Sequence, residues 1–251
     1  MKSGLVSVVT PMYNSEKFVE YTIKSVLGQT YENWEMIIVD DGSKDLSADI
    51  VSKYCSIDKR IQLIRQKNSG SASARNNGIR VASGQYITLL DSDDLWDSNF
   101  LEEQIALMKK TNSIVVCSSY RKINTDGKEI LRPTLVKERV TVKDMQRTNY
   151  IACLTGVYDI SKHGKIFLKE ELKSIRDDYA YWLDVVKLQG FAYGNRNVLA
   201  SYRVMQNSTT GKKHKLIKSQ FNFYYNYQKL SLIRSVYNTI YWAFRGFLNL
   251  K

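Results

Sequence analysis

The sequence is poor in several residues on which common functional sites depend. Two histidines in 251 residues exclude a zinc site built from a histidine cluster. The three cysteines are far apart and form no CxxC pair, which indicates a reducing compartment rather than a disulfide framework. No two glycines are spaced as GxG, and no GxxxxGK[ST] segment occurs. The sequence therefore contains neither the dinucleotide-binding fingerprint nor the P-loop.

Long apolar runs and prolines are also scarce. No stretch approaches the roughly 18–20 apolar residues that span a bilayer, and the run Leu5–Thr10 is too short for the core of a signal peptide. Two prolines and no low-complexity segment argue against domains on long linkers. With 43% hydrophobic and 25% charged residues, the composition is globular. We expect a protein that stays inside the cell, either soluble or peripheral on a membrane.

Acidic residues are missing from the C-terminal part of the chain. Asp184 is the last one, and the eleven charged residues after it are all Lys or Arg. Of the 37 basic residues, 26 lie before this point together with all 25 acidic ones, so most of the net charge of +12 belongs to the C-terminal part. A basic segment on a nearly neutral body favours a docking device over nucleic-acid binding, and we expect no nucleic-acid partner.

Two periodicities alternate over the first hundred residues. Short β-branched runs predict buried strands at Leu5–Thr10, Trp34–Val39, Ile61–Arg65 and Tyr86–Leu90. Helical spacing of apolar residues predicts helices at Glu16–Gln29, Leu46–Cys55, Ser71–Val81 and Phe100–Lys110, the first with Ser15 as its N-cap. This order is typical of an α/β fold with a mostly parallel central sheet flanked by helices.

The pattern is weaker in the second half. We expect a strand at Ile114–Tyr120, a hairpin into Glu129–Arg132, a helix at Asp178–Leu188 and a strand at Val198–Val204. The segment Pro133–Leu168 has little periodicity and is expected to wrap a pocket.

Polar clusters follow each of the first four predicted strands: Tyr13-Asn14, Asp40-Asp41-Gly42-Ser43, Asn68-Ser69-Gly70 and Asp91-Ser92-Asp93-Asp94. Ligands of such sheets bind outside the carboxyl ends of the strands. The four clusters therefore predict one pocket.

The acidic cluster has two interpretations. Asp91 and Asp93 are two residues apart and can converge on a hard divalent cation, Mg²⁺ or Mn²⁺. The alternative is an acidic turn that caps the next helix.

Two further clusters also have two interpretations each. Asp41 can bind a base or a ribose, or simply form a loop with an Asx-turn. The helix that starts near Ser71 can meet an anion with Arg75 one turn in, or be an ordinary glycine-rich helix start.

In order and spacing, the segments VSVVTPMYN, IIVDDGS, NSGSASARNNGI and GQYITLLDSDD resemble the family 2 glycosyltransferases of the GT-A fold. These are inverting enzymes that use nucleotide-diphosphate sugars. The resemblance is strong over residues 5–100 and weaker to about residue 210. It implies that Pro11, Tyr13 and Asn14 line the base and ribose, that Asp41 holds a uracil-type base and that Arg75 lies near the nucleotide.

The resemblance also assigns the acidic cluster. Asp91 and Asp93 match the DxD motif around Ser92, with Asp93 as the usual metal ligand and Asp91 reaching the ribose. Asp94 is a substitute ligand, because family members differ in which Asp binds the cation. Many members carry His where this sequence has Met205, and Met is a poor ligand for hard cations, which leaves the third metal ligand open.

The segment Arg176–Leu183 resembles the family's ED-Y-x-x-W-L sequence, with Asp in place of Glu. The resemblance makes Asp178 the general base and puts Asp177 and Trp182 on the phosphate or acceptor side. The alternative for the two carboxylates is helix capping, and the alternative for Trp182 is packing of the helix onto the sheet. After Val198, the chain resembles the family's closing loop, in which Arg203 or Lys212 would screen the phosphates.

Residues 212–251 predict a helical tail. From Ile233 on, apolar residues recur at helical spacing: Ile233, Val236, Tyr237, Ile240, Tyr241, Phe244, Phe247 and Leu248. Basic residues flank this stripe, as in helices that lie on anionic lipid. The alternative is a helix that packs on the catalytic domain or on a second subunit. Similar tails occur in bacterial glycosyltransferases that build O-antigen or capsule units on an undecaprenyl carrier.

Taken together, we expect a catalytic domain over residues 1–211, divided into a nucleotide-sugar half (1–110) and an acceptor half (111–211), and a basic aromatic tail (212–251). The expected reaction is inverting transfer from a nucleotide-diphosphate sugar, a UDP-sugar by preference, to a glycan or polyprenyl-linked acceptor on the inner face of the bacterial membrane. The alternatives are a nucleotidyltransferase on a similar sheet and a non-catalytic membrane or nucleic-acid adaptor.

Overall fold

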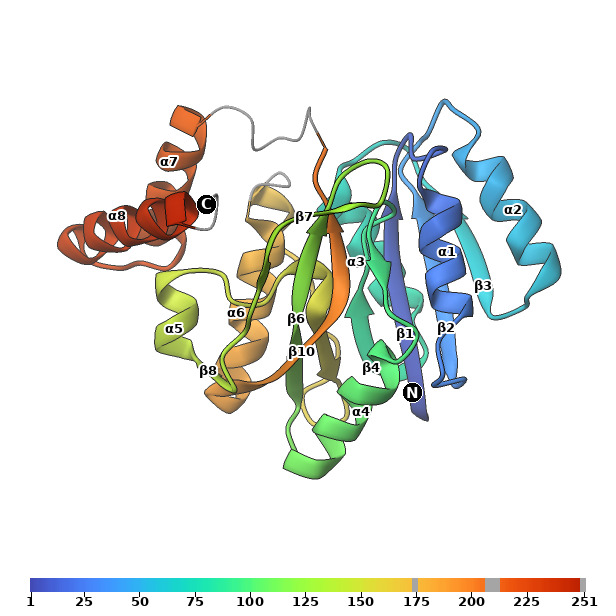
Figure 1. Cartoon of the computed structure of the whole chain (residues 1–251), viewed down its shortest axis with the longest axis horizontal. Coiled ribbons are helices and arrows are strands. Elements are labelled where there is room, and N and C mark those ends of the chain that lie inside the picture. Colours follow the sequence, from blue (N-terminus) through green and yellow to red (C-terminus); the bar gives the residue numbers. More distant parts are fainter. Residues whose placement is uncertain (173–175, 206–212, 249–251) are drawn as a thin grey trace.

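The computed structural model describes residues 1–172, 176–205 and 213–248, without the side chains at 213–215 and 245–248. Within these ranges one sheet of ten strands runs through the molecule in the order β3-β2-β1-β4-β9-β6-β10-β5, with β7 and β8 pairing on β6 and β10. Helices cover both of its faces (Figure 1).

The N-terminal half of the sheet is parallel. Its strands are β1 (Lys2–Met12), β2 (Trp34–Asp40), β3 (Ile61–Arg65) and β4 (Gly84–Leu89). The helices between them are α1 (Val19–Leu27), α2 (Ser47–Ile57) and α3 (Ser71–Val81). The predicted strand and helix alternation is confirmed here, because buried β-branched runs and amphipathic helices have different periods.

The second half of the sheet is mixed. β6 (Val115–Ile123) and β10 (Phe191–Arg203) are parallel to each other, while β5 (Leu95–Trp96), β7 (Glu129–Thr134) and β8 (Arg139–Thr141) are antiparallel to their neighbours. β9 (Gly156–Asp159) lies antiparallel between β4 and β6.

The stretch Pro133–Leu168 therefore does more than wrap a pocket, which corrects our expectation. It supplies the strand that joins the two halves of the sheet, together with β8 and the short helix α5 (Val142–Arg147). A four-residue strand is too short to show periodicity. Close packing against α6 (Asp177–Gln189) holds this strand in place. A Cβ on Gly156 would meet the Trp182 ring at 2.4 Å, so only glycine fits beneath that ring.

Two apolar cores lie on opposite faces of the sheet. α1, α2 and α4 (Phe100–Thr111) bury their apolar sides against one face. α3 and α6 (Asp177–Gln189) cover the other. Because both faces are covered, β1 and β2 read as continuous apolar runs rather than alternating ones.

The C-terminal tail packs on the second of these faces. It consists of α7 (Lys213–Asn222), a π-helical turn (Phe223–Tyr227) and α8 (Leu232–Leu248). Phe223 and Tyr224 are buried in the core beside α6, so one face of the tail is part of the folded body, as the packing alternative expected. No helix in the described ranges is both long and apolar enough to cross a bilayer.

Candidate active site

The predicted site residues gather at the edge of the sheet where β1, β2 and β4 end, the upper edge in Figure 1. α6 starts at the same edge and runs down from it. This arrangement brings carboxylates from opposite halves of the chain into contact with one cation.

That cation is Arg75 on α3. Its Nη2 donates to Asp91 Oδ1 at 2.5 Å, and its Nη1 donates to Asp177 Oδ2 at 3.0 Å. Arg75 and Asp177 are 6% and 3% exposed, so this pair is shielded from water and its interaction is little screened. Sequence reasoning placed Arg75 near the nucleotide; the structure places it between the DxD segment and the start of α6.

The acidic segment after β4 is held by the backbone of β10. Asp94 is buried and accepts the Arg203 backbone N–H at 2.8 Å. The Arg203 side chain donates to the backbone carbonyls of Asp93, Asn124 and Thr125. Arg203 is itself 4% exposed, so it clamps two loops to the end of β10. Phosphate screening by Arg203 stays a prediction, and Lys212 lies outside the described residues.

Negative charge in this segment is incompletely compensated. Burial, then the charge of Asp91, raises the pKa of Asp93 to about 6. Burial and the charges of Asp93 and Asp91 also raise the pKa of Asp94 well above its usual range. Asp94 Oδ2 is buried and finds no hydrogen-bond partner among the described residues. Such a group favours an additional cation.

The carboxylates therefore fit a divalent metal ion on chemical grounds. Carboxylate oxygens are hard ligands, and Mg²⁺ typically binds one or two of them together with the phosphates of a substrate. In the part of the chain that the structure describes, no three His, Cys, Asp or Glu side chains come close enough to hold a metal without such a substrate. Asp93 and Asp94 offer the uncompensated oxygens, whereas Asp91 is already paired with Arg75.

Asp177 and Asp178 form the first turn of α6. Their negative charges lie at the positive end of the helix dipole. Asp178 is half-buried, and its burial, together with the charge of Asp177, raises its pKa to about 6. Arg176 precedes them with φ 69°, a left-handed conformation that is uncommon outside glycine. Its guanidinium Cζ lies 5.0 Å from the centroid of the Trp242 ring in α8.

Asp41 holds the loop between β3 and α3. Its two carboxylate oxygens accept the backbone N–H groups of Ser69 and Gly70 at 2.7 and 2.8 Å, and the Gln66 side chain at 2.8 Å. Gly42 next to it has φ 78°, and a Cβ there would lie 3.1 Å from the Asn68 nitrogen. The predicted contact of Asp41 with a base stays untested; the structure adds a second role in shaping the loop.

The loop after β1 contains an exposed aromatic side chain. Tyr13 is 49% exposed at the strand ends, whereas Pro11 is buried within β1. Asn14 has φ 48° and is fixed by hydrogen bonds with Ser43 and Lys44 of the β2–α2 loop. Tyr13 is thus free to stack on a ligand, while Asn14 ties two loops together.

Sequence reasoning missed three residues of the site. Ser15 does not cap α1, which starts only at Val19; its Oγ instead lies 2.7 Å from Ser92 Oγ and links the first loop to the acidic segment. Cys153 is buried with its Sγ 4.0 Å from Asp91 Oδ1. Burial and the charges of Asp94, Asp91 and Asp93 raise the pKa of Tyr202. None of these contacts joins residues that are near in sequence.

Trp182 is the exception among the predicted site residues. Its side chain is completely buried against Gly156 and Tyr181. It therefore has no surface for an acceptor to touch, and it fixes α6 on the sheet. Residues 179–183 of α6 are all buried, so the structure supports the packing role of Trp182 rather than the acceptor role.

Comparisons with known proteins agree with this geometry. The model of the family described as glycosyl transferase family 2 matches residues 7–176, which contain the four strand-end clusters. The chain belongs to glycosyl transferase family 2. The nucleotidyltransferase and adaptor alternatives are thereby replaced by one enzyme class.

Two relatives match this glycosyltransferase over nearly their whole length. One, from Bacillus subtilis (strain 168), is named as a teichuronic acid biosynthesis glycosyltransferase, TuaG; it is 36% identical over 95% of this chain and 94% of its own. The other is the UDP-Glc:alpha-D-GlcNAc-diphosphoundecaprenol beta-1,3-glucosyltransferase WfgD of Escherichia coli, 34% identical over 94% of this chain and 92% of its own.

Solved structures show the same fold. S. aureus TarS 1–349 in complex with UDP-GlcNAc has a TM-score of 0.70 at 21% identity, over 92% of this chain and 69% of that one. The mannosyltransferase PcManGT from Pyrobaculum calidifontis, in complex with GDP-Man and Mn²⁺, has a TM-score of 0.63 at 16% identity, over 86% and 61%. The predicted GT-A fold is confirmed.

Proposed function

We propose that this glycosyltransferase moves a sugar from a nucleotide-diphosphate sugar, a UDP-sugar by preference, to a hydroxyl of a lipid-linked glycan, with inversion, in the synthesis of a cell-surface polysaccharide. The names of two relatives support the cell-surface role. One name refers to teichuronic acid biosynthesis, and the other refers to UDP-Glc and a diphosphoundecaprenol-linked acceptor. The observation that carries the proposal is the Arg75 bridge between Asp91 and Asp177.

The bridge supports this proposal because one guanidinium holds Asp91 and Asp177 close together. Asp91 belongs to the DxD segment, which would meet the nucleotide diphosphate. Asp177 adjoins Asp178, which would meet the acceptor hydroxyl. A sugar between them would have its leaving group on one side and the attacking oxygen on the other, the in-line arrangement that inversion requires.

Asp178 would act as the general base. A carboxylate with a pKa of about 6 is mostly ionised at neutral pH and is a stronger base than an ordinary Asp. It takes the proton of the acceptor hydroxyl while that oxygen attacks the anomeric carbon, and the nucleotide diphosphate leaves with the bonding electron pair. Arg75 pairs with Asp177 beside it, and the negative charge of Asp177 adds to the effect of burial in raising the pKa of Asp178.

Asp93 and Asp94, with Asp91 close by, would hold a divalent cation, Mn²⁺ or Mg²⁺. When bound, this cation supplies positive charge to the leaving diphosphate. The solved PcManGT complex, which contains Mn²⁺ and GDP-Man on a similar fold, supports this assignment. Tyr13 would stack on the base. Asp41 would bind the base or keep the loop between β3 and α3 in place.

Contact with an anionic membrane surface through residues 212–251 is the third part of the proposal. Ile233, Ile240 and Phe244 on α8 are 82%, 65% and 60% exposed, although they are large and apolar. Patches of this kind mark interaction sites. A surface helix with such a face and basic flanks binds lipid interfaces, and that would bring the active site to an acceptor with a lipid anchor.

The direct test is transfer itself. The full chain is incubated with Mn²⁺, a panel of UDP- and GDP-sugars, and a synthetic diphospholipid that carries a single sugar. We expect one UDP-sugar to yield a product whose new linkage, assigned by NMR, has the anomeric configuration opposite to that of the donor. A product with retained configuration, or nucleotide release only from GDP-sugars, would overturn the proposal as stated.

A further inference from the structure

A small basic pocket lies between the catalytic domain and the tail. Helix α5 contributes Lys143 and Arg147, and α8 contributes Arg234, Tyr237 and Asn238. The cavity has a volume of about 70 Å³, which is room for several water molecules or for one tetrahedral oxyanion. Three cationic side chains from two separate elements thus surround one small space.

The two helices that form the pocket are fixed to each other. Asn238 Nδ2 on α8 donates to the Gln146 backbone carbonyl on α5 at 3.0 Å. The Tyr224 hydroxyl of the tail donates to the Arg147 carbonyl. Thr141 and Asp144 form a capping box that sets the start of α5. The three cations are therefore presented by a built scaffold.

Their charge is not neutralised within the protein. Asp144, the one acidic residue of α5, accepts from Thr141 and pairs with Lys137 at 2.6 Å. Over the described part of the chain, no ion pair links an acidic side chain to Lys143, Arg147 or Arg234. Since no Asp or Glu follows Asp184 in the sequence, the tail cannot supply one either. An external anion is the natural partner.

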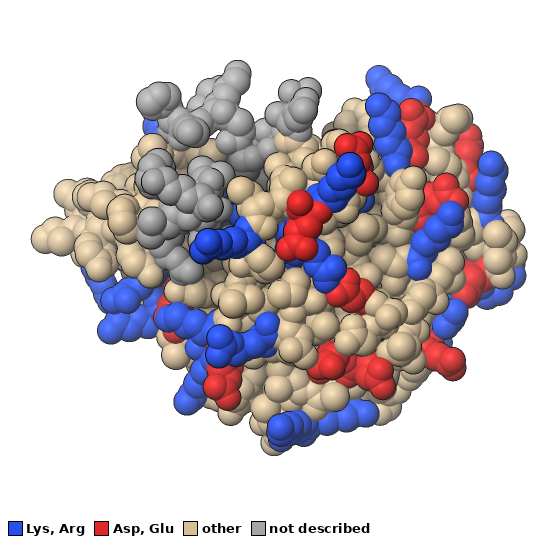
Figure 2. Space-filling model, viewed as in Figure 1, with Lys and Arg blue, Asp and Glu red and all other residues tan. Residues whose placement is uncertain are grey.

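The pocket borders the exposed apolar face of α8. With 100° per residue, Ile233, Tyr237, Ile240 and Phe244 lie on one side of the helix, opposite the buried Ser235 and Asn238. Arg234 projects about 100° from Ile233, at the flank of this face and toward α5. In Figure 2, the left end of the molecule is correspondingly tan, with Lys and Arg beneath it.

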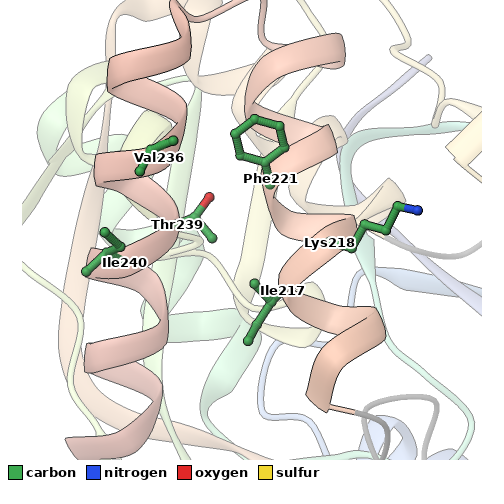
Figure 3. Close-up of a pocket in the computed structure, with 6 residues that line it drawn as sticks. All are labelled: Ile217, Lys218, Phe221, Val236, Thr239 and Ile240. Atoms are coloured by element: carbon green, nitrogen blue, oxygen red, sulfur yellow. The ribbon is translucent and has the colours of Figure 1, made fainter.

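On the other flank of α8 an apolar groove runs between α7 and α8. Its volume is about 350 Å³, and Ile217 and Phe221 of α7 face Val236 and Ile240 of α8 across it (Figure 3). Lys218 lies at its rim. One continuous surface therefore offers a cationic pocket, an apolar helix face and an apolar groove, side by side.

We propose that the pocket of Lys143, Arg147 and Arg234 binds the phosphate headgroup of an anionic phospholipid, while the apolar face of α8 enters the membrane interface. The proposal rests on the membrane contact in the proposed function and extends it: α5, part of the catalytic domain, becomes part of the membrane-binding surface. The tail would then hold the catalytic domain in one orientation on the bilayer, because contacts from two elements define a plane whereas a single helix does not.

A lipid explains the surface better than a free phosphate. A soluble anion would use the cations but would leave the apolar face and groove in water. An interfacial lipid uses all three, since its phosphate lies at the level of the cations and its chains at the level of the apolar residues.

The test is binding of the full chain to vesicles of phosphatidylcholine with and without 30% phosphatidylglycerol. The variant Lys143→Gln/Arg147→Gln/Arg234→Gln is compared with a control that removes the same charge from other exposed sites, Lys109→Gln/Lys110→Gln/Lys128→Gln. At about 1 kcal/mol per basic residue near an anionic surface, we expect a loss of about fivefold per residue and of about a hundredfold for the triple variant. The control should lose less than threefold.

Equal losses in the two triple variants would overturn the proposal, because net charge alone would then explain binding. Arg234→Gln alone changes only an exposed side chain, so it should fold normally and lose about fivefold; unchanged binding would count against the pocket. Vesicle binding is measured in chloride buffer free of phosphate: wild-type binding that is the same with and without phosphatidylglycerol would overturn the lipid assignment.

Donor binding separates this proposal from the proposed function. UDP affinity should be the same in both triple variants and in the wild-type protein. If the chain bound no nucleotide but still lost vesicle binding only in the pocket variant, the transfer reaction would be refuted and the headgroup site supported.

Discussion

Arg75 donates to Asp91 with one terminal nitrogen, at 2.5 Å, and to Asp177 with the other, at 3.0 Å. The two carboxylates are 86 positions apart in a chain of 251 residues, one after β4 and the other at the start of α6. Arg75 and Asp177 are buried, whereas the Asp91 side chain is 29% exposed, so Asp177 above all depends on this guanidinium for its compensation.

Arg75→Lys should therefore cost both stability and activity. A single ammonium lacks the planar fork that reaches two carboxylates, so one buried charge is left unpaired. Breaking a buried pair costs about 3–5 kcal/mol, and we expect the free energy of unfolding in urea to fall toward this range and kcat to fall at least tenfold. Arg80→Lys, on the exposed side of the same helix, is the control. Wild-type stability in Arg75→Lys would contradict the bridge.

Asp93→Ala should abolish Mn²⁺-dependent binding of UDP. Asp93 carries a carboxylate whose compensation is poor without a bound cation. In the wild-type protein, UDP and Mn²⁺ at about 100 times their dissociation constant should stabilise the fold by about 2.7 kcal/mol, seen as a rise in Tm. This rise should vanish in the variant and in EDTA, and persist in Asp126→Ala, an exposed hairpin carboxylate. A persistent rise in Asp93→Ala would move the metal site elsewhere.

The variant Asp178→Asn should still bind the donor nucleotide but should lose transfer activity. The amide fills the same space but cannot take a proton, so kcat should fall by about 10²–10⁴, with the Kd for UDP unchanged within twofold. Calorimetry for binding and a nucleotide-release assay for turnover give the two numbers. Asp184→Asn, six residues further along α6, is the matched control and should keep near-wild-type turnover. Normal transfer by Asp178→Asn would remove it as the base.

The pH profile should report the same carboxylate. The pKa of Asp178 is about 6, raised by its burial and by Asp177, and only the ionised form acts as a base. We therefore expect kcat/KM to fall about tenfold per pH unit below pH 6 and to level off above it. A profile that is flat from pH 5 to pH 8 would be inconsistent with Asp178 as the base.

Trp242→Ala should shift this profile, although Trp242 belongs to the tail. Its ring packs on the Arg176 guanidinium, and the positive charge of Arg176 lowers the pKa of Asp178. Without the ring, Arg176 is free to turn toward solvent, so the apparent pKa should move to higher pH and activity at pH 6 should drop. Tyr241→Ala serves as the control, and an equal shift there would point to a general loosening of the tail.

The sequence determined the local elements and the chemistry of the clusters. Buried runs such as Trp34–Val39 and helical spacing such as Ser71–Val81 have periods that a short window already reveals. The ends of the first four strands, and hence the meeting of Asp41, Arg75 and Asp91 at one edge, followed from the rule that parallel strands share a carboxyl end.

Tertiary structure alone decided which polar groups use one another. The insertion of β9, the bridge from Arg75 to Asp177, the contact of Ser15 with Ser92 and the division of α8 into a buried and an exposed face all join residues distant in sequence. Periodicity carries information over one or two turns of chain, whereas ion pairs, burial and surface faces are properties of three-dimensional proximity. That is why the sequence could name the candidate carboxylates, while only the fold could show which groups hold them.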